Sequence, residues 1–191
     1  MIRLFLALMV LLPSMAFGNV FGGYKLTDSQ QRLLSMAYVI GKQYDLAETT
    51  QAILFQETLA GAFGDGIGDK SNGHLKESYG VMQIKLATAR WVMWKKPHLM
   101  HEFFDSYPND YELRDRLIND NSFNIRIGAA NLYILRQYTN NWVELVVAYN
   151  TGLGGMRTLP EPRSHHYYSL VVSKLLNVIR PYNKHWLGQL F

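Results

Sequence analysis

The spacing of apolar and polar residues along the chain is that of helices rather than strands. In residues 121–138 the apolar side chains recur at intervals of three and four, which places them on one helix face: Ile125, Ala129, Leu132 and Leu135. Residues 27–44 show a similar periodicity and begin with Thr27, followed three residues later by Gln30. This spacing predicts a capping box at the start of a helix.

The same pattern predicts more helices in the rest of the chain, over residues 46–57, 87–96, 142–149 and 165–179, with a short one around 111–118. Residues 46–57 are apolar on nearly all sides, which is typical of a buried helix. Asn121 and Ser122 are both candidate caps for the long helix. Pro181 should end the last helix, because the residue before a proline disfavours helical backbone.

Glycines and polar residues mark two long loops, around residues 61–77 and 150–164. Asn150, followed closely by Gly152, is typical of a helix C-terminus, since Asn tolerates left-handed backbone. Strand signals are sparse. We therefore expect an all-α single domain of about seven helices, with its functional residues on loops.

The N-terminus has the three-part pattern of a secretory signal peptide. Arg3 supplies a positive charge, residues 4–12 are apolar, and Ala16 and Gly18 place small residues before a cut at Asn19. The apolar run is far shorter than the roughly 20 residues of a membrane span. We expect a signal peptide over residues 1–18, a mature domain over 19–191 and a periplasmic location. An uncleaved N-terminal anchor is the alternative.

Composition limits the classes of partner. Hydrophobic residues make up 48% of the 191 and charged residues 18%, as in a single globular domain. The net charge of +4 comes without a Lys/Arg run, which argues against nucleic acid. The absence of cysteine excludes disulfides and thiolate sites. Adjacent His165 and His166 would face different ways on a helix, so they are a poor pair of metal ligands. We expect no metal, no cofactor and, without heptads, a monomer.

Three short clusters contain residues suited to chemistry on a sugar polymer. Glu57 ends the apolar helix, where partial burial would raise its pKa and keep it protonated as a general acid; a solvated surface carboxylate is the alternative. The second cluster offers a stacking ring, close backbone approach and amide groups, at Ser78, Tyr79, Gly80, Met82 and Gln83. The third is Tyr149-Asn150. Each of the last two could equally be a purely structural junction.

In this order the clusters resemble the catalytic domain of soluble lytic transglycosylases, a family related to goose-type lysozymes. The family motifs Glu-Ser, Gly-Leu-Met-Gln, Asn-Ile-x-x-Gly and Ala-Tyr-Asn-Ala-Gly are similar to Glu57-Thr58, Gly80-Val81-Met82-Gln83, Asn124-Ile125-Arg126-Ile127-Gly128 and Ala148-Tyr149-Asn150-Thr151-Gly152. A Ser-Tyr-Gly like that at Ser78 is common in phage and conjugation members. The loop before Gly80 is longer than the family's.

The family's last motif is a Tyr at the start of a helix that contacts the catalytic Glu. Tyr167 and Tyr168 are both candidates, and the spacing to Val171 and Val172 favours Tyr167. The Glu-Thr pair that precedes this Tyr in the family is missing. The resemblance implies a lysozyme-like fold with a substrate cleft, with Glu57 as the catalytic residue. It also implies that Gln83, Tyr149 and Asn150 position the substrate.

The resemblance implies cleavage of the β-1,4 bond between N-acetylmuramic acid and N-acetylglucosamine in peptidoglycan, with a 1,6-anhydromuramic product. Three alternatives stay open. One is a hydrolytic lysozyme of the same fold, for which Asp65, Asp69 and Glu77 are candidate second carboxylates. Another is a weakly active wall-binding module of a secretion, conjugation or phage machine. The third is a phage enzyme whose N-terminus is an export or anchor signal.

Overall fold

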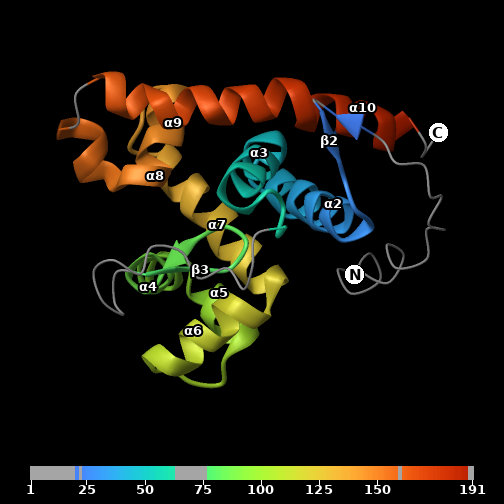
Figure 1. Cartoon of the computed structure of the whole chain (residues 1–191). Helices are drawn as coiled ribbons and strands as arrows, with labels where there is room; N and C mark the ends of the chain where they lie inside the picture. Colours follow the sequence, from blue (N-terminus) through green and yellow to red (C-terminus); the bar gives the residue numbers. More distant parts are fainter. Residues whose placement is uncertain (1–19, 22, 63–76, 159–160, 189–191) are drawn as a thin grey trace.

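Helices dominate the computed structural model, which describes residues 20–21, 23–62, 77–158 and 161–188. The all-α class is confirmed. The predicted signal peptide, residues 1–18, and most of the loop before Gly80 lie outside the described residues. Figure 1 shows the C-terminal helices as a nearly continuous rod along one side of the molecule, with α4, α5 and α6 gathered on the other side. No helix among the described residues is long and apolar enough to cross a membrane.

Two antiparallel helices, α2 (Asp28–Lys42) and α3 (Ala47–Thr58), pack closely together. The predicted capping box is present, because the Thr27 side chain accepts from the Gln30 N–H and the Gln30 side chain accepts from the Thr27 N–H. A short strand β1 (Val20–Phe21) pairs with β2 (Tyr24–Lys25) before α2. The interior of α3 is buried on nearly all sides, as its apolar sequence predicts.

The long helix α7 (Asn121–Arg136) forms the centre of the core and packs against α2, α3, α4, α6 and α8. Its N-cap is Asp120, whose side chain accepts from the Phe123 N–H at 3.0 Å. The prediction of Asn121 or Ser122 as the cap is therefore wrong by one or two residues. All are good capping types, so the local sequence does not choose among them.

The middle of the chain contains more regular structure than its pattern predicts. Helix α4 (Leu86–Lys95) ends before a short α5 (Pro97–Phe103), which is not among the predicted helices. Pro97 is at the first turn of α5, where a missing N–H costs nothing. Helix α6 (Asp110–Asn119) confirms the predicted short helix and starts with a capping box from Asn109 and Glu112. Two strands of two residues each, β3 (Ser78–Tyr79) and β4 (Ile84–Lys85), pair as an antiparallel hairpin.

The second predicted loop is largely helical. Helix α8 (Trp142–Thr158) continues past Tyr149 and is interrupted only at Gly152, where φ is 74° and ψ is 167°. The left-handed position is thus Gly152 and not Asn150, since glycine takes positive φ without steric cost. The glycine pattern correctly marks a break, but helix resumes beyond it.

The C-terminal rod joins α9 (Glu161–Lys174), the π-helical turn η3 (Leu175–Ile179) and α10 (Arg180–Gly188). The prediction that the last helix stops before Pro181 is wrong. In an α-helix the proline ring would clash with the carbonyl four residues earlier. The wider π turn directly before Arg180 relieves that clash, so the helix continues.

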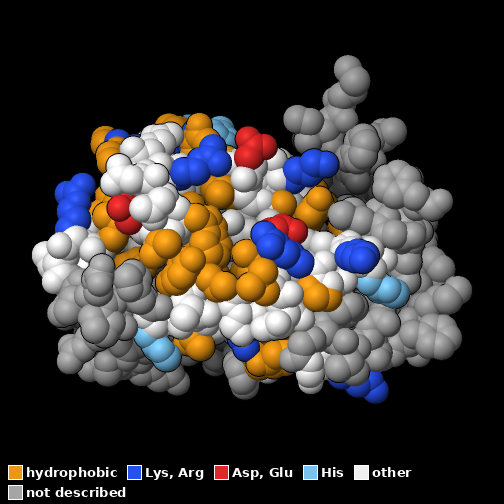
Figure 2. All heavy atoms as spheres, turned by 90° about the horizontal axis from the view of Figure 1, so that it is seen from above, with side chains coloured by type: hydrophobic (Ala, Val, Ile, Leu, Met, Phe, Trp, Pro, Cys, Tyr) orange, Lys and Arg blue, Asp and Glu red, His pale blue; other side chains and the backbone are white. Residues whose placement is uncertain are grey.

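On the face seen in Figure 2, Lys and Arg side chains lie apart and alternate with acidic and hydrophobic ones. This face shows no continuous basic stripe, in agreement with the sequence.

Candidate active site

The side chain of Glu57 lies at the C-terminal end of α3, where the chain turns sharply. Leu59 and Ala60 both take left-handed backbone, with φ of 48° and 54°, and Gly61 follows with φ of 80°. The Glu57 side chain is partly buried and accepts a hydrogen bond from the hydroxyl of Tyr167 on α9. The chain thus brings a helix end and a residue 110 positions later into direct contact.

The surroundings of Glu57 make its ionisation costly. Burial raises the pKa of Glu57 from 4.5 to about 7, although the hydrogen bond from Tyr167 acts in the opposite direction by stabilising the carboxylate. Among the described residues, no acidic side chain contributes to this shift. A carboxyl group with a pKa near neutrality can both donate and accept a proton at physiological pH.

Two tyrosines face the Glu57 carboxyl. Burial raises the pKa of Tyr167 and of Tyr149 well above the ordinary value, and the charge of Glu57 raises both further. Tyr149, on α8, donates its hydroxyl to the carbonyl oxygen of Met82 at 2.8 Å. Both phenols stay neutral: the Tyr167 hydroxyl donates to the Glu57 carboxyl, and the Tyr149 hydroxyl donates to the Met82 backbone.

The expected alternative between Tyr167 and Tyr168 is decided by these contacts. Tyr167 contacts Glu57, whereas the ring of Tyr168 packs edge-on against Trp142 with centroids 5.5 Å apart. The spacing argument for Tyr167 is confirmed.

The hairpin turn beside Glu57 depends on Gly80. Its φ is +71°, and a Cβ there would lie 2.2 Å from both the Asn124 side-chain nitrogen and the Leu117 carbonyl oxygen. Asn124 donates to the carbonyls of Tyr79 at 2.8 Å and Leu117 at 3.0 Å. It also accepts from the Met82 N–H at 2.8 Å. One buried amide on α7 therefore fixes the turn on both sides.

Helix α3 and the hairpin are also joined directly by a hydrogen bond. The Thr58 hydroxyl donates to the Val81 carbonyl oxygen at 3.0 Å and accepts from the Gly61 N–H at 3.0 Å. Gly128 on α7 makes room for the Met82 side chain, since a Cβ there would lie 2.6 Å from the Met82 methyl carbon. The motif residues next to Glu57 and on α7 thus hold the site together.

Gln83 ends this turn in a constrained conformation. Its φ is 50°, and its side-chain nitrogen donates to the Gly80 carbonyl oxygen at 2.9 Å. The Ser78 hydroxyl donates to the Gln83 side-chain oxygen at 2.9 Å. Both side chains are partly exposed, and Asn150 is exposed, so all three are placed where a ligand can reach them.

Two predicted substrate contacts have buried side chains instead. Tyr79 is 0% exposed, and its hydroxyl donates to the Glu77 carboxylate at 2.9 Å. The prediction that its ring stacks on a sugar is wrong, because the ring belongs to the core under the hairpin. Met82 is also 0% exposed, so only its backbone belongs to the site.

No group of acidic and histidine residues suited to a metal ion occurs in the described parts of the chain. Asp65, Asp69 and His74 lie outside them. A cavity of about 580 Å³ between α5 and α6 is lined by residues such as Phe104, Asp115 and Arg116 and does not include Glu57.

The family model described as "Transglycosylase SLT domain" matches residues 67–165, just over half of the chain. The chain belongs to this transglycosylase family. No curated protein matches the chain. Membership supports cleavage of peptidoglycan glycan strands as the class of activity. The matched segment contains Ser78, Gln83, Tyr149 and Asn150, whereas Glu57 and Tyr167 are contributed by the elements that flank it.

The anchoring roles of Asn124 and Thr58 were not predicted from the sequence. Asn124 is a fully buried amide among mostly apolar buried residues of α7. A polar residue in such a position needs partners in the fold, and this signal could have identified it.

Proposed function

We propose that this protein is a lytic transglycosylase that cleaves the bond between N-acetylmuramic acid and N-acetylglucosamine, with Glu57 as its only acid and base. The observation that carries the proposal is the partly buried Glu57 carboxyl, whose pKa is raised to about 7 and which accepts a hydrogen bond from Tyr167. A single group that holds and releases a proton near neutral pH is what a non-hydrolytic cleavage requires.

In the proposed reaction, protonated Glu57 gives its proton to the glycosidic oxygen as the bond from C1 of the muramic sugar breaks. The N-acetylglucosamine unit leaves with a free 4-hydroxyl. The substrate's own acetamido oxygen stabilises the cationic C1. Glu57, now a carboxylate, removes the proton from the muramic 6-hydroxyl, and O6 bonds to C1. Glu57 ends protonated, no water is consumed, and no second protein carboxylate is needed, unlike in common glycosidases.

Burial of Glu57 and its hydrogen bond from Tyr167 favour different halves of this cycle. The Tyr167 hydroxyl stabilises the carboxylate form that follows the first step, while burial keeps the resting form protonated. Substrate positioning falls to the partly exposed Ser78 and Gln83, the Gly80 backbone and the exposed Asn150.

We also propose a periplasmic location after removal of residues 1–18, because that segment has the sequence pattern of a signal peptide. Local opening of the cell wall for a secretion, conjugation or phage machine is the role that fits a small enzyme of this kind.

Digestion of purified sacculi tests the activity, with wild-type protein compared with Glu57→Gln. Soluble fragments lighter than hydrolytic ones by one water, absent with Glu57→Gln, are the expected result. Fragments with a free reducing end would identify a hydrolase. Binding without turnover by the wild type would identify a wall-binding module.

A further inference from the structure

Two tyrosines stand exposed next to the hairpin of the proposed site. Tyr107, just before α6, is 58% exposed, and Tyr111, in its first turn, is 74% exposed. Large aromatic side chains at the surface offer a broad apolar face with a polar tip. This aromatic pair has no part in the chemistry at Glu57.

The start of α6 is continuous with the site. Helix α6 packs against β3. The Arg114 guanidinium lies 5.8 Å from the ring centroid of Tyr79, and the charge of Asp110 contributes to the raised pKa of Tyr79. Since Tyr79 lies directly beside Gly80 in the hairpin, the start of α6 borders the hairpin that holds Ser78 and Gln83.

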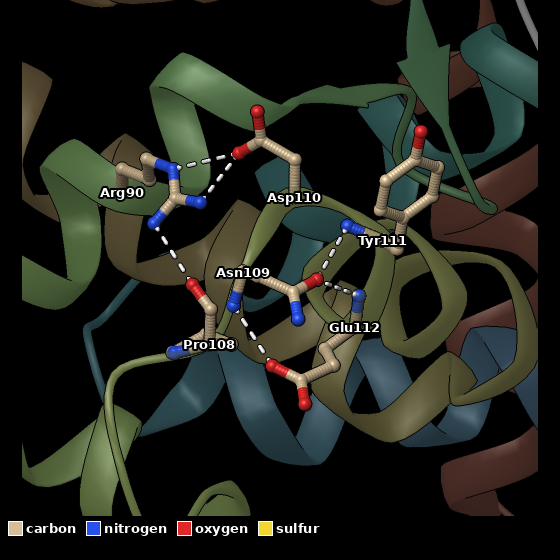
Figure 3. Close-up of polar contacts among 6 residues, drawn as sticks. All are labelled: Arg90, Pro108, Asn109, Asp110, Tyr111 and Glu112. Atoms are coloured by element: carbon tan, nitrogen blue, oxygen red, sulfur yellow. Dashed lines mark hydrogen bonds and ion pairs between the residues drawn. The ribbon is translucent and has the colours of Figure 1, made fainter.

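Hydrogen bonds and an ion pair order the backbone that carries the aromatic pair. The Arg90 guanidinium donates to the Asp110 carboxylate at 2.5 Å and to the Pro108 carbonyl oxygen at 3.2 Å, and lies 5.0 Å from the Tyr107 ring centroid. Asn109 and Glu112 close the capping box that fixes the first turn of α6. Figure 3 shows the side chains of Asp110 and Tyr111 extending to one side of this turn and that of Glu112 to the other.

We propose that Tyr107 and Tyr111 form a stacking platform for sugar units of the glycan strand beyond those held at Glu57. This inference rests on the proposed function. The hexosamine rings of peptidoglycan present faces of C–H groups that pack on aromatic rings, and their hydroxyls match the polar rim of Asp110 and Arg90. Because hydrogen bonds and an ion pair already order the first turn of α6, little conformational entropy is lost when the glycan strand binds.

The test uses the inactive Glu57→Gln protein, so that binding is measured apart from cleavage. Co-sedimentation with purified sacculi gives a Kd for this protein and for the same protein with Tyr107→Ala and Tyr111→Ala. The double substitution should raise the Kd by roughly fivefold to tenfold, the loss expected for two exposed ring contacts. Tyr107→Phe with Tyr111→Phe should bind as the unsubstituted protein does.

Tyr138→Ala is the matched control, because Tyr138 is an exposed tyrosine beyond the C-terminal end of α7. It should leave the Kd unchanged. Equal binding by the double alanine variant and its parent, with equal thermal unfolding, would overturn the platform. So would equal loss in the Phe and Ala variants. Failure of the active wild type to release fragments would count against the proposed function alone, since the sedimentation result does not depend on turnover.

In active protein, the double alanine substitution should raise the KM for long glycan strands and leave kcat unchanged. A short fragment that reaches little beyond the cleaved bond should show no change. Equal effects on short and long substrates would contradict a role for the aromatic pair in extended binding.

Discussion

A carboxyl group acts as a general acid near neutral pH only where its surroundings make ionisation costly, and Glu57 is in such surroundings. Partial burial at the end of α3 raises its pKa to about 7, and the bond from Tyr167 limits the rise. Burial therefore keeps Glu57 protonated before the reaction, and the hydrogen bond from Tyr167 makes loss of that proton less costly. This balance has consequences for stability and for the pH dependence of activity.

Glu57→Gln should increase the stability of the protein at high pH. The folded state binds the Glu57 proton more tightly than the unfolded state, so the free energy of unfolding falls as pH rises from 4.5 to about 7. Above that range the ionised group costs about 3 kcal/mol. Urea unfolding at pH 8 should show a gain of up to about 3 kcal/mol for the variant, and at pH 4 almost none. The same difference at both pH values would contradict the raised pKa.

Tyr167→Phe should shift the pH profile in a definite direction. The lost hydrogen bond stabilised the carboxylate, so the pKa of Glu57 should rise further, and the decline of kcat/KM on the alkaline side should move to higher pH. Activity at the optimum should fall roughly tenfold or more, because the carboxyl is less well positioned. Tyr168→Phe is the control and should keep the wild-type profile. A shift to lower pH in Tyr167→Phe would contradict the assignment.

At the scale of secondary structure, the site is assembled by polar contacts between short elements. Thr58 joins the end of α3 to the hairpin, and Asn124 joins the hairpin to α7. All three contacts are buried, so removing either partner leaves a polar group without a hydrogen bond and is costly. The turn at Gly80 is the point where they meet.

Gly80→Ala should therefore abolish folding or cost more than about 3 kcal/mol. The new Cβ would meet a backbone carbonyl at 2.2 Å, and φ of +71° is strained for alanine. Gly154→Ala is the matched control, because nothing lies within 4 Å of a Cβ there. It should be neutral or stabilising by up to about 1 kcal/mol. Thermal unfolding distinguishes the two, and a Gly80→Ala protein as stable as wild type would refute the close packing of the turn.

Local chemistry explains which elements the sequence predicts well. The Thr27 box and the break at Gly152 depend on neighbours in the chain and are confirmed. The helix passes Pro181 because a π turn precedes Arg180, and Tyr79 is buried because the hairpin packs against α6; neither feature was predicted from the sequence. The Glu57–Tyr167 pair spans 110 positions and came from the family resemblance, since no periodicity links the two.

At the scale of the whole molecule, the C-terminal rod supports α3, the helix that carries Glu57. Gln51 on α3 and Asn183 on α10 exchange two hydrogen bonds, at 3.0 and 2.8 Å, and both side chains are buried. Tyr182 contacts the Ser35 hydroxyl at 2.8 Å on α2. Residues beyond the family match thus fix α3, and with it Glu57.

Asn183→Ala should leave the Gln51 side-chain oxygen without its donor, while the Gln51 nitrogen keeps its bond to the Leu34 carbonyl oxygen. The protein should be destabilised by about 1–3 kcal/mol. Asn177→Ala, at an exposed position on η3, should change stability by less than about 0.5 kcal/mol. Urea unfolding of the two variants measures the difference. If Asn183→Ala is as stable as Asn177→Ala, the rod is not anchored through this pair.

The most direct test of the account is digestion of sacculi in water labelled with heavy oxygen, followed by mass spectrometry of the fragments. If Glu57 alone completes the reaction through the muramic 6-hydroxyl, the new muramic ends carry no heavy oxygen, and Glu57→Gln releases no fragments. Heavy oxygen in those ends would show that water attacks C1, and would contradict the single-carboxylate mechanism.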